Sequence, residues 1–229
     1  MCYDDYMIRS CPLVNGQVYH VMNKSIAGYK IFCGKRDYER MLMALRFFTL
    51  KSPPAKFSRF LISEQVKDEG FNACVEALGA ELGRRVQIIA YCIMPTHLHL
   101  VAKQLDEKGL SEMLRMSLNS YARYFNIKYG RKGTLFTGPF KNVLVENDGQ
   151  LLNLTRYVHL NPVTAGLVDK PESWSYSSYM EYVQPKEVDY PLSRFKGLID
   201  DKPSAYRKFV EDYKDYQREL ALIKAQVLE

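Results

Sequence analysis

The chain has 229 residues, of which 47% are hydrophobic and 25% are charged, and it carries a formal net charge of +6. This composition excludes a chain disordered over most of its length, and the length suits one domain with an appendage, since a domain takes about 100–200 residues. The best apolar run, Val86–Met94, is far shorter than the ~20 residues that cross a bilayer, and the start MCYDDYMIRS lacks the regions of a signal peptide, so we expect a cytoplasmic protein.

Three stretches in the first half of the chain predict strands. Residues 17–26 are rich in β-branched and aromatic side chains, and residues 86–94 have the apolar character of a buried strand. Residues 97–103 follow after a turn at Pro95, so these last two strands are expected to pair as an antiparallel hairpin. Helical spacing of apolar residues predicts a helix over 36–50, and residues 57–82 are expected to be partly helical.

The second half of the chain predicts mainly helices. Residues 110–129 carry apolar residues on one helical face, and a basic loop then leads to a candidate strand at 141–145. Asn147 or Asp148 can cap a further helix that we expect to end near Leu160, because Pro162 cannot continue it far. We therefore expect a domain over residues 1–182 and a C-terminal extension over 183–229, with a helix at 204–228.

The basic charge is concentrated in one window, Met113–Val145, which contains no acidic residue. Its basic residues, which equal the net charge of the whole chain, are Arg115, Arg123, Lys128, Arg131, Lys132 and Lys141. Aromatic residues, including Tyr121 and Tyr124, are interleaved with them. Cations neutralise phosphates and aromatic faces stack on unpaired bases, so the window suits single-stranded nucleic acid. A solvated helix face with its aromatic side chains in the core explains the same pattern.

Two histidines begin the second strand of the predicted hairpin. Residues i and i+2 of a strand point to the same face, so His97 and His99 present two imidazoles on one side while Leu98 faces the core. Two neutral imidazole nitrogens can bind one divalent cation. Polar residues at the end of a strand would look the same, and the pair alone does not decide between these interpretations.

A second pair lies on the helix before Pro162. Tyr157 and Asn161 are four residues apart and thus share a helical face. The amide oxygen of Asn161 could complete a neutral ligand set with His97 and His99, and the phenol could attack a phosphate that the metal polarises. A tyrosine packed at the edge of the core is the alternative. We expect His159 to be structural or a distant phosphate contact, and His20 to lie at the surface or the edge of the core.

Three blocks together resemble a known family. AYCIMPTHLHLVAK (90–103) resembles the His-hydrophobe-His segment of HUH single-tyrosine transposases. RYVHLNPVTAGLV (156–168), followed by WSYSSY, is similar to REP-associated tyrosine transposases (RAYTs) of the IS200-like superfamily. YARYFNIKYGRKGTLFTGPFK (121–141) resembles the basic segment of that family. The resemblance runs from about residue 17 to residue 179.

This resemblance implies an α+β fold, with a ferredoxin-like (RRM-like) antiparallel sheet backed by helices. It implies that His97 and His99 bind the metal, that Tyr157 is the nucleophile, and that Asn161 is the additional metal-binding amide. The implied reaction is cleavage of single-stranded DNA near a hairpin with Mg²⁺ or Mn²⁺, through a 5′-phosphotyrosine link, followed by rejoining. Insertion-sequence members of the superfamily commonly carry a glutamine where this chain has Asn161.

Three functions remain open at this stage. The first is a DNA-nicking and strand-transferring enzyme with hairpin DNA as its partner and no small-molecule cofactor. The second is a domesticated binder of repeated hairpin sequences whose catalysis is vestigial, and the third is a phosphodiesterase that uses water. Relatives include dimers and monomers, so a homodimer is open as well.

Overall fold

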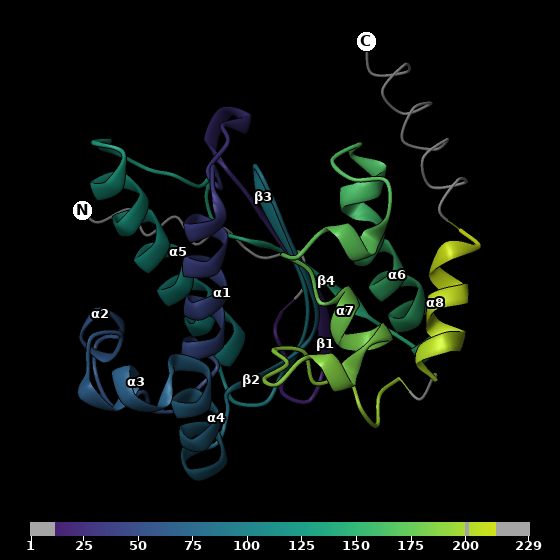
Figure 1. Cartoon of the computed structure of the whole chain (residues 1–229), viewed down its shortest axis with the longest axis horizontal. Coiled ribbons are helices and arrows are strands. Elements are labelled where there is room, and N and C mark those ends of the chain that lie inside the picture. Colours follow the sequence, from purple (N-terminus) through teal and green to yellow (C-terminus); the bar gives the residue numbers. More distant parts are fainter. Residues whose placement is uncertain (1–11, 200–201, 214–229) are drawn as a thin grey trace.

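A computed structural model of the chain describes residues 12–199 and 202–213 (Figure 1). The helices and strands in these residues are β1 (Val18–Lys24), a 3₁₀ turn (Ile26–Gly28), α1 (Lys35–Phe48), α2 (Phe57–Phe60), α3 (Glu64–Glu69), α4 (Phe71–Leu82), β2 (Val86–Met94), β3 (His97–Gln104), α5 (Gly109–Lys128), β4 (Lys141–Val145), α6 (Asp148–Thr164), a 3₁₀ turn (Pro171–Ser173), α7 (Tyr179–Val183), a 3₁₀ turn (Pro185–Glu187) and α8 (Pro203–Glu211). None of these helices is long and apolar enough to span a membrane.

The four strands form one antiparallel sheet in the order β2-β3-β1-β4. Because α1 lies between β1 and β2 in the chain and α5 lies between β3 and β4, the order of elements is the β-α-β-β-α-β arrangement of ferredoxin-like folds. The predicted α+β class with a ferredoxin-like sheet is therefore confirmed.

Helices cover both faces of the sheet (Figure 1). On one face, Leu98 and Leu100 of β3 join a core with Met41 of α1 and Leu114 of α5. On the other face, a second core contains Val101 of β3 together with residues of α6, α7 and α8, including Val158, Tyr182 and Tyr206. The helices α5 and α6 thus lie on opposite sides of the same sheet. The candidate residues on α5 are therefore separated by the sheet from those on α6.

One predicted boundary is wrong. The helix α6 does not end near Leu160 but continues through Pro162 to Thr164. Proline removes one backbone donor and so weakens a helix. Here Pro162 and Val163 are buried, Val163 in the second core, and the amide of Ala165 still donates to the carbonyl oxygen of Asn161 at 2.9 Å. Burial and the remaining hydrogen bonds therefore carry the helix one turn further.

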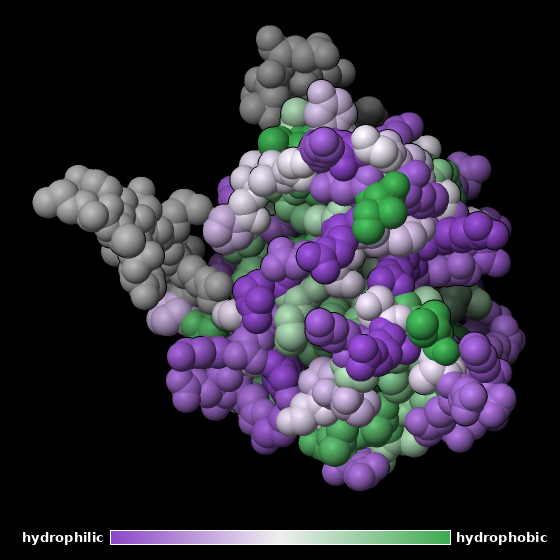
Figure 2. Space-filling model, turned by 90° about the vertical axis from the view of Figure 1, so that its left-hand side faces the viewer, coloured by the Kyte–Doolittle hydropathy of each residue, from purple (hydrophilic) through white to green (hydrophobic). Residues whose placement is uncertain are grey.

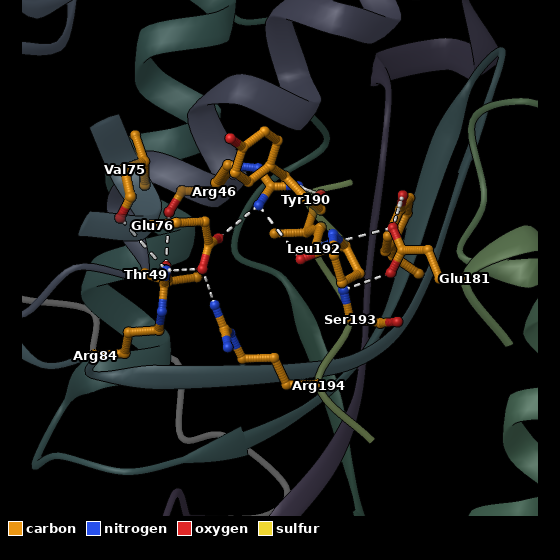
Figure 3. Close-up of polar contacts among 12 residues, drawn as sticks. Arg46, Thr49, Val75, Glu76, Arg84, Glu181, Tyr190, Leu192, Ser193 and Arg194 are labelled. Carbon is orange, nitrogen blue, oxygen red and sulfur yellow. Dashed lines mark hydrogen bonds and ion pairs between the residues drawn. The ribbon is translucent and has the colours of Figure 1, made fainter. Parts of the chain in front are cut away.

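A group of arginines around one glutamate joins the two layers of helices (Figure 3). Glu76 of α4 forms ion pairs with Arg46 of α1 at 2.8 Å, with Arg84 at 3.1 Å and with Arg194. The guanidinium of Arg46 also donates to the carbonyl oxygen of Tyr190 at 2.6 Å. The segment that follows α7 is thereby held against α1 and α4.

A second carboxylate anchors the same segment from the other side (Figure 3). Glu181 of α7 is buried and accepts hydrogen bonds from the Tyr91 hydroxyl at 2.8 Å and from the backbone amides of Leu192 and Ser193. Further along, α8 packs against α6 and α7. The described residues after 182 therefore pack on the elements before them. The boundary at residue 182 stays a prediction, and the predicted helix beyond residue 213 lies outside the described residues.

Candidate active site

Three imidazoles meet on the face of the sheet that α6 covers. In the register of β1 and β3, Met22 lies opposite His99 and Lys24 lies opposite His97. His20 Nε2 lies 3.1 Å from His99 Nδ1, and these two rings are stacked with their centroids 5.3 Å apart. The centroids of His97 and His99 are 5.0 Å apart. The two histidines of the predicted pair are thus neighbours on one face, and His20 joins them.

All three imidazoles are held in the neutral form. Burial lowers the pKa of His20 and of His97 to about 4, and the charge of nearby Lys24 adds to the effect at His97. The pKa of His99 falls to about 3 through burial and then through repulsion by His97, His20 and Lys24. At neutral pH each ring therefore has one nitrogen with a lone pair, which is the form that binds metal ions.

In the described part of the chain, His97 and His99 each have one ring nitrogen that lies against a partner and a second one that is left without a hydrogen-bond partner. His99 Nε2 is buried and has no hydrogen-bond partner, whereas His99 Nδ1 faces His20. His97 Nδ1 lies 2.9 Å from the hydroxyl of Thr96, so its Nε2 remains the nitrogen for a ligand. Metal-binding histidines commonly place their other nitrogen against such a partner. His20 Nε2 faces His99 Nδ1, and in residues 12–199 and 202–213 no three His, Cys, Asp or Glu side chains are placed so that all could bind one metal. His97 and His99 would therefore need a further ligand of another type.

Tyr157 of α6 lies over the imidazoles, and Asn161 follows one turn later on the same helix. The Tyr157 ring meets His99 edge-on at a centroid distance of 5.7 Å and His20 at 6.0 Å, and the residue is 40% exposed. Burial raises the pKa of the Tyr157 phenol, and a hydrogen bond with the Asn161 side chain opposes that rise. The amide nitrogen of Asn161 also donates to the carbonyl oxygen of Tyr157 at 2.9 Å. The structure thus brings Tyr157 to the histidines, and metal binding by Asn161 stays a prediction.

The helix that carries Tyr157 is fixed at its start and along its buried side. The side chain of Asn147 caps it by accepting from the amide of Gln150 at 2.8 Å. His159 is buried, with Nδ1 2.7 Å from the Tyr206 hydroxyl and Nε2 2.7 Å from the Ser178 hydroxyl. His159 is therefore a structural residue that ties α6 to α8, and it leaves Tyr157 on the open side of the helix.

The basic window lies mainly on the other face of the sheet. Its helix α5 packs against α1 in the first core. Within the described part of the chain, Arg115, Arg123, Lys132 and Lys141 are exposed and form no ion pair. Arg131 stabilises the loop that contains it by donating a hydrogen bond to the carbonyl oxygen of Thr134 at 2.8 Å. Lys141 lies opposite Met22 in the β1–β4 register, which makes it the member of the set on the sheet beside the histidines.

Three residues that we expected to contact DNA have other roles in the structure. Tyr121 is fully buried and its hydroxyl donates to the carbonyl oxygen of Ile31, so its ring cannot stack on a base. The hydroxyl of Tyr124 and the ammonium of Lys128 both bind Asp37, at 3.1 and 2.5 Å. Burial alone would raise the pKa of Asp37, but hydrogen bonds from Lys128 and its other donors hold that pKa below its usual range.

Two residues near the site were missed or undervalued in the sequence. The sequence predicts a position at the surface or the edge of the core for His20, and no local pattern indicates a role for Lys24. Both lie on β1 at even spacing, so they share a face, and that face is the one toward which His97 and His99 point. The pairing of β1 with β3 joins segments that are far apart in the chain, so no local sequence pattern predicts it.

The chain is similar in part to proteins that are already known. No protein-family model matches the chain. A curated Haemophilus influenzae protein, whose name places it among the REP-associated tyrosine transposases, is 31% identical over 105 residues. That match covers 41% of this chain and 58% of the relative, which is less than two thirds of the relative's length. A solved structure, described as a REP-associated tyrosine transposase bound to a REP hairpin, aligns with a TM-score of 0.49 and 16% identity over 85% of this chain and 93% of that chain. The chain is similar to REP-associated tyrosine transposases, as its three sequence blocks predict.

Proposed function

We propose that this protein is a metal-dependent enzyme that nicks and rejoins single-stranded DNA near hairpin or repeat sequences, with Tyr157 as its nucleophile. The observation that carries the proposal is the approach of the Tyr157 ring to His99, whose Nε2 is buried without a partner. The name of the relative supports a transposase-type reaction.

In the proposed reaction a side chain of the protein, and not water, attacks the phosphorus. Tyr157 Oη would form a bond to the phosphorus of the DNA while the bond from phosphorus to the 3′ oxygen breaks. The phenol loses its proton and the departing 3′ oxygen takes one up, which leaves a 5′-phosphotyrosine and a free 3′-hydroxyl. That hydroxyl, or the end of another strand, can reverse the step and rejoin the DNA.

Charge stabilisation is needed because the phenol is not ionised at neutral pH. His97, His99 and the amide oxygen of Asn161 would hold a divalent cation, Mg²⁺ or Mn²⁺. When bound, such a cation polarises the phosphate and lowers the cost of the charge that develops on it. Burial raises the pKa of Tyr157, so the phenol is protonated at neutral pH when the phosphate binds. Lys24, whose charge acts on both His97 and His99, is positioned to attract that phosphate.

A covalent adduct tests the proposal. The protein is incubated with a labelled single-stranded DNA hairpin and Mn²⁺, and a DNA-linked band is expected on a denaturing gel. The band should vanish in Tyr157→Phe and on chelation of the metal. Tyr190→Phe is the matched control, since Tyr190 has a similar exposed fraction of 41% and lies away from the histidines. Absence of an adduct with every member of a broad hairpin library would overturn the proposal.

A binder of repeated hairpin DNA without catalysis is the second candidate. It is favoured by the lack, within the described residues, of three His, Cys, Asp or Glu side chains grouped for a metal. Such a binder would hold the same hairpins in the presence of a chelator and in Tyr157→Phe, and would cleave none of them. An adduct that depends on Tyr157 excludes it.

A further inference from the structure

The face of the molecule that carries α5 has several hollows, and two of them adjoin at the C-terminal half of α5. The larger, of about 1150 Å³, lies between α1, α5 and the segment before α2. The smaller, of about 550 Å³, lies where α5 runs into the loop that follows it. Arg123 and Ile127 line both hollows, so the two form one continuous groove across α5. Figure 2 views the molecule from this side, whose surface is largely hydrophilic with scattered hydrophobic patches.

The groove is cationic and its walls contain no acidic residue. The larger hollow is lined by Arg40, Lys56, Arg123 and Lys128, and the smaller by Arg123, Arg131 and Lys132. Lys128 is neutralised by Asp37. Within the described part of the chain, Arg40, Lys56, Arg123 and Lys132 have no ion-pair partner. The groove therefore gathers positive charge that the rest of the protein does not balance.

Arg40 is the residue that most needs a partner. Its guanidinium lies over the ring of Phe57 at 4.4 Å and near the ring of Tyr124 at 5.4 Å. Its Nε is buried and has no hydrogen-bond acceptor, and burial lowers the pKa of the group. A half-buried cation without a counter-charge is costly, and an anion in the groove would lower that cost. A guanidinium fixed on aromatic rings presents a planar fork that matches a phosphate.

We propose that this groove binds the phosphodiester backbone of a nucleic acid, at a segment separate from the one at Tyr157. The inference rests on the proposed DNA function and extends it. An extended row of cations across two hollows fits a polymer with regularly spaced phosphates better than a single phosphate ion. The groove lies on the α1–α5 side of the sheet, whereas Tyr157 lies on the α6 side, so one long DNA could contact both.

The test compares two labelled DNAs, a hairpin with long single-stranded flanks and the same hairpin without flanks. The double variant K56Q/R123Q removes two exposed cations from the groove. Its affinity for the flanked hairpin should fall by about tenfold at moderate salt, and the slope of log affinity against log salt should shrink by about 2, or about 1 per lost phosphate contact. Its affinity for the hairpin without flanks should change by less than about twofold.

Two further variants keep the result interpretable. K67Q/K196Q removes the same charge at exposed positions that do not line either hollow, and it should bind both DNAs like the unchanged protein. Arg40→Lys keeps the charge but loses the fork, and it should weaken binding of the flanked hairpin alone. Equal binding of the flanked DNA by K56Q/R123Q and K67Q/K196Q overturns the proposal, and so does an equal loss for both DNAs.

The outcome is separable from that of the nicking reaction. If K56Q/R123Q loses affinity for the flanked hairpin while no variant or substrate yields an adduct, the groove stands and the catalytic proposal fails. If an adduct forms through Tyr157 but the groove variants bind like the control, the groove proposal fails alone. Circular dichroism melting of each variant confirms that the folded state is retained.

Discussion

The contact between His99 and His20 determines which tautomer of His99 is favoured. Its Nδ1 lies 3.1 Å from His20 Nε2, and both rings are neutral. If His99 carries its proton on Nδ1 and donates it to His20, the lone pair is on the buried, unpartnered Nε2. The opposite tautomer would place a proton on Nε2, with no acceptor for it. Burial of an unpaired donor is unfavourable, so the site favours the tautomer that can bind a metal.

His20 should therefore be a positioning residue for metal binding. His20→Phe keeps a ring on β1 but removes the acceptor, and Mn²⁺ affinity should fall by about 10- to 100-fold, as losses of such partners commonly do. Isothermal titration of the protein with MnCl₂, without DNA, measures this directly. His20→Gln retains an oxygen that can accept from His99 and should bind more tightly than the phenylalanine variant. Equal Mn²⁺ affinity in His20→Phe and the unchanged protein would rule out this role.

At the scale of the elements, local patterns predicted most of the secondary structure. The strand β2 has the predicted bounds, and α5 differs from the predicted helix by one residue at each end. The spacing of His97 and His99 was enough to place them on one face. Local patterns do not predict the pairing of β1 with β3, which brings His20 to His99 from a distant part of the chain.

Local patterns also predict only part of what the residues of the basic helix α5 do. Tyr121 lies on the apolar face of α5 together with Leu118 and Phe125, and that spacing already indicated a core position. Its ring therefore belongs to the core and not to a DNA-binding surface. The role of Lys128 could not be read locally, because its partner Asp37 is on α1 and about ninety residues away in the chain.

One buried imidazole, that of His159, lies in the contact between α6 and α8. Burial lowers the pKa of His159 to about 3, whereas an unfolded chain has an ordinary histidine pKa of about 6.5. The unfolded state therefore binds an extra proton as the pH falls below about 6.5. The stability that the neutral imidazole contributes is complete above that pH and is lost progressively down to about pH 3.

This linkage predicts destabilisation by mild acid. At pH 5 the His159 contribution alone should lower the free energy of unfolding by about 2 kcal/mol relative to pH 7. Urea unfolding at both pH values measures the difference. In His159→Gln the titration is removed, so the difference between pH 7 and pH 5 should shrink by about the same amount, whatever the absolute stability of the variant. An unchanged difference would mean that His159 is not held neutral.

At the scale of the whole molecule, the sheet separates two surfaces. The α6 side carries the imidazoles and Tyr157, and the α1–α5 side carries the cationic groove. The segment after α7 connects the layers, because Arg46 and Arg194 both bind Glu76 while Glu181 holds Leu192 and Ser193 (Figure 3). A DNA that contacts both surfaces would bind two layers of helices that these polar contacts hold together.

Glu76 should accordingly matter more than an ordinary surface carboxylate. Its side chain is 24% exposed, and three guanidinium groups converge on it, one of them, that of Arg46, only 8% exposed. Glu76→Gln leaves these cations crowded without a counter-charge, and should lower the free energy of unfolding by about 2 kcal/mol, less than for a fully buried pair because solvent screens part of the interaction. Urea unfolding followed by far-ultraviolet circular dichroism measures this.

The matched control is Glu39→Gln, which breaks the exposed pair with Lys35 on α1. That pair is separated by 3.6 Å and has side chains 47% and 79% exposed, so its loss should cost less than about 0.5 kcal/mol. If both variants lose the same small amount, the Glu76 cluster is only a set of surface ion pairs. If Glu76→Gln alone unfolds at lower urea, the cluster is what holds the segment after α7, and through it the layer of Tyr157, against α1 and α4.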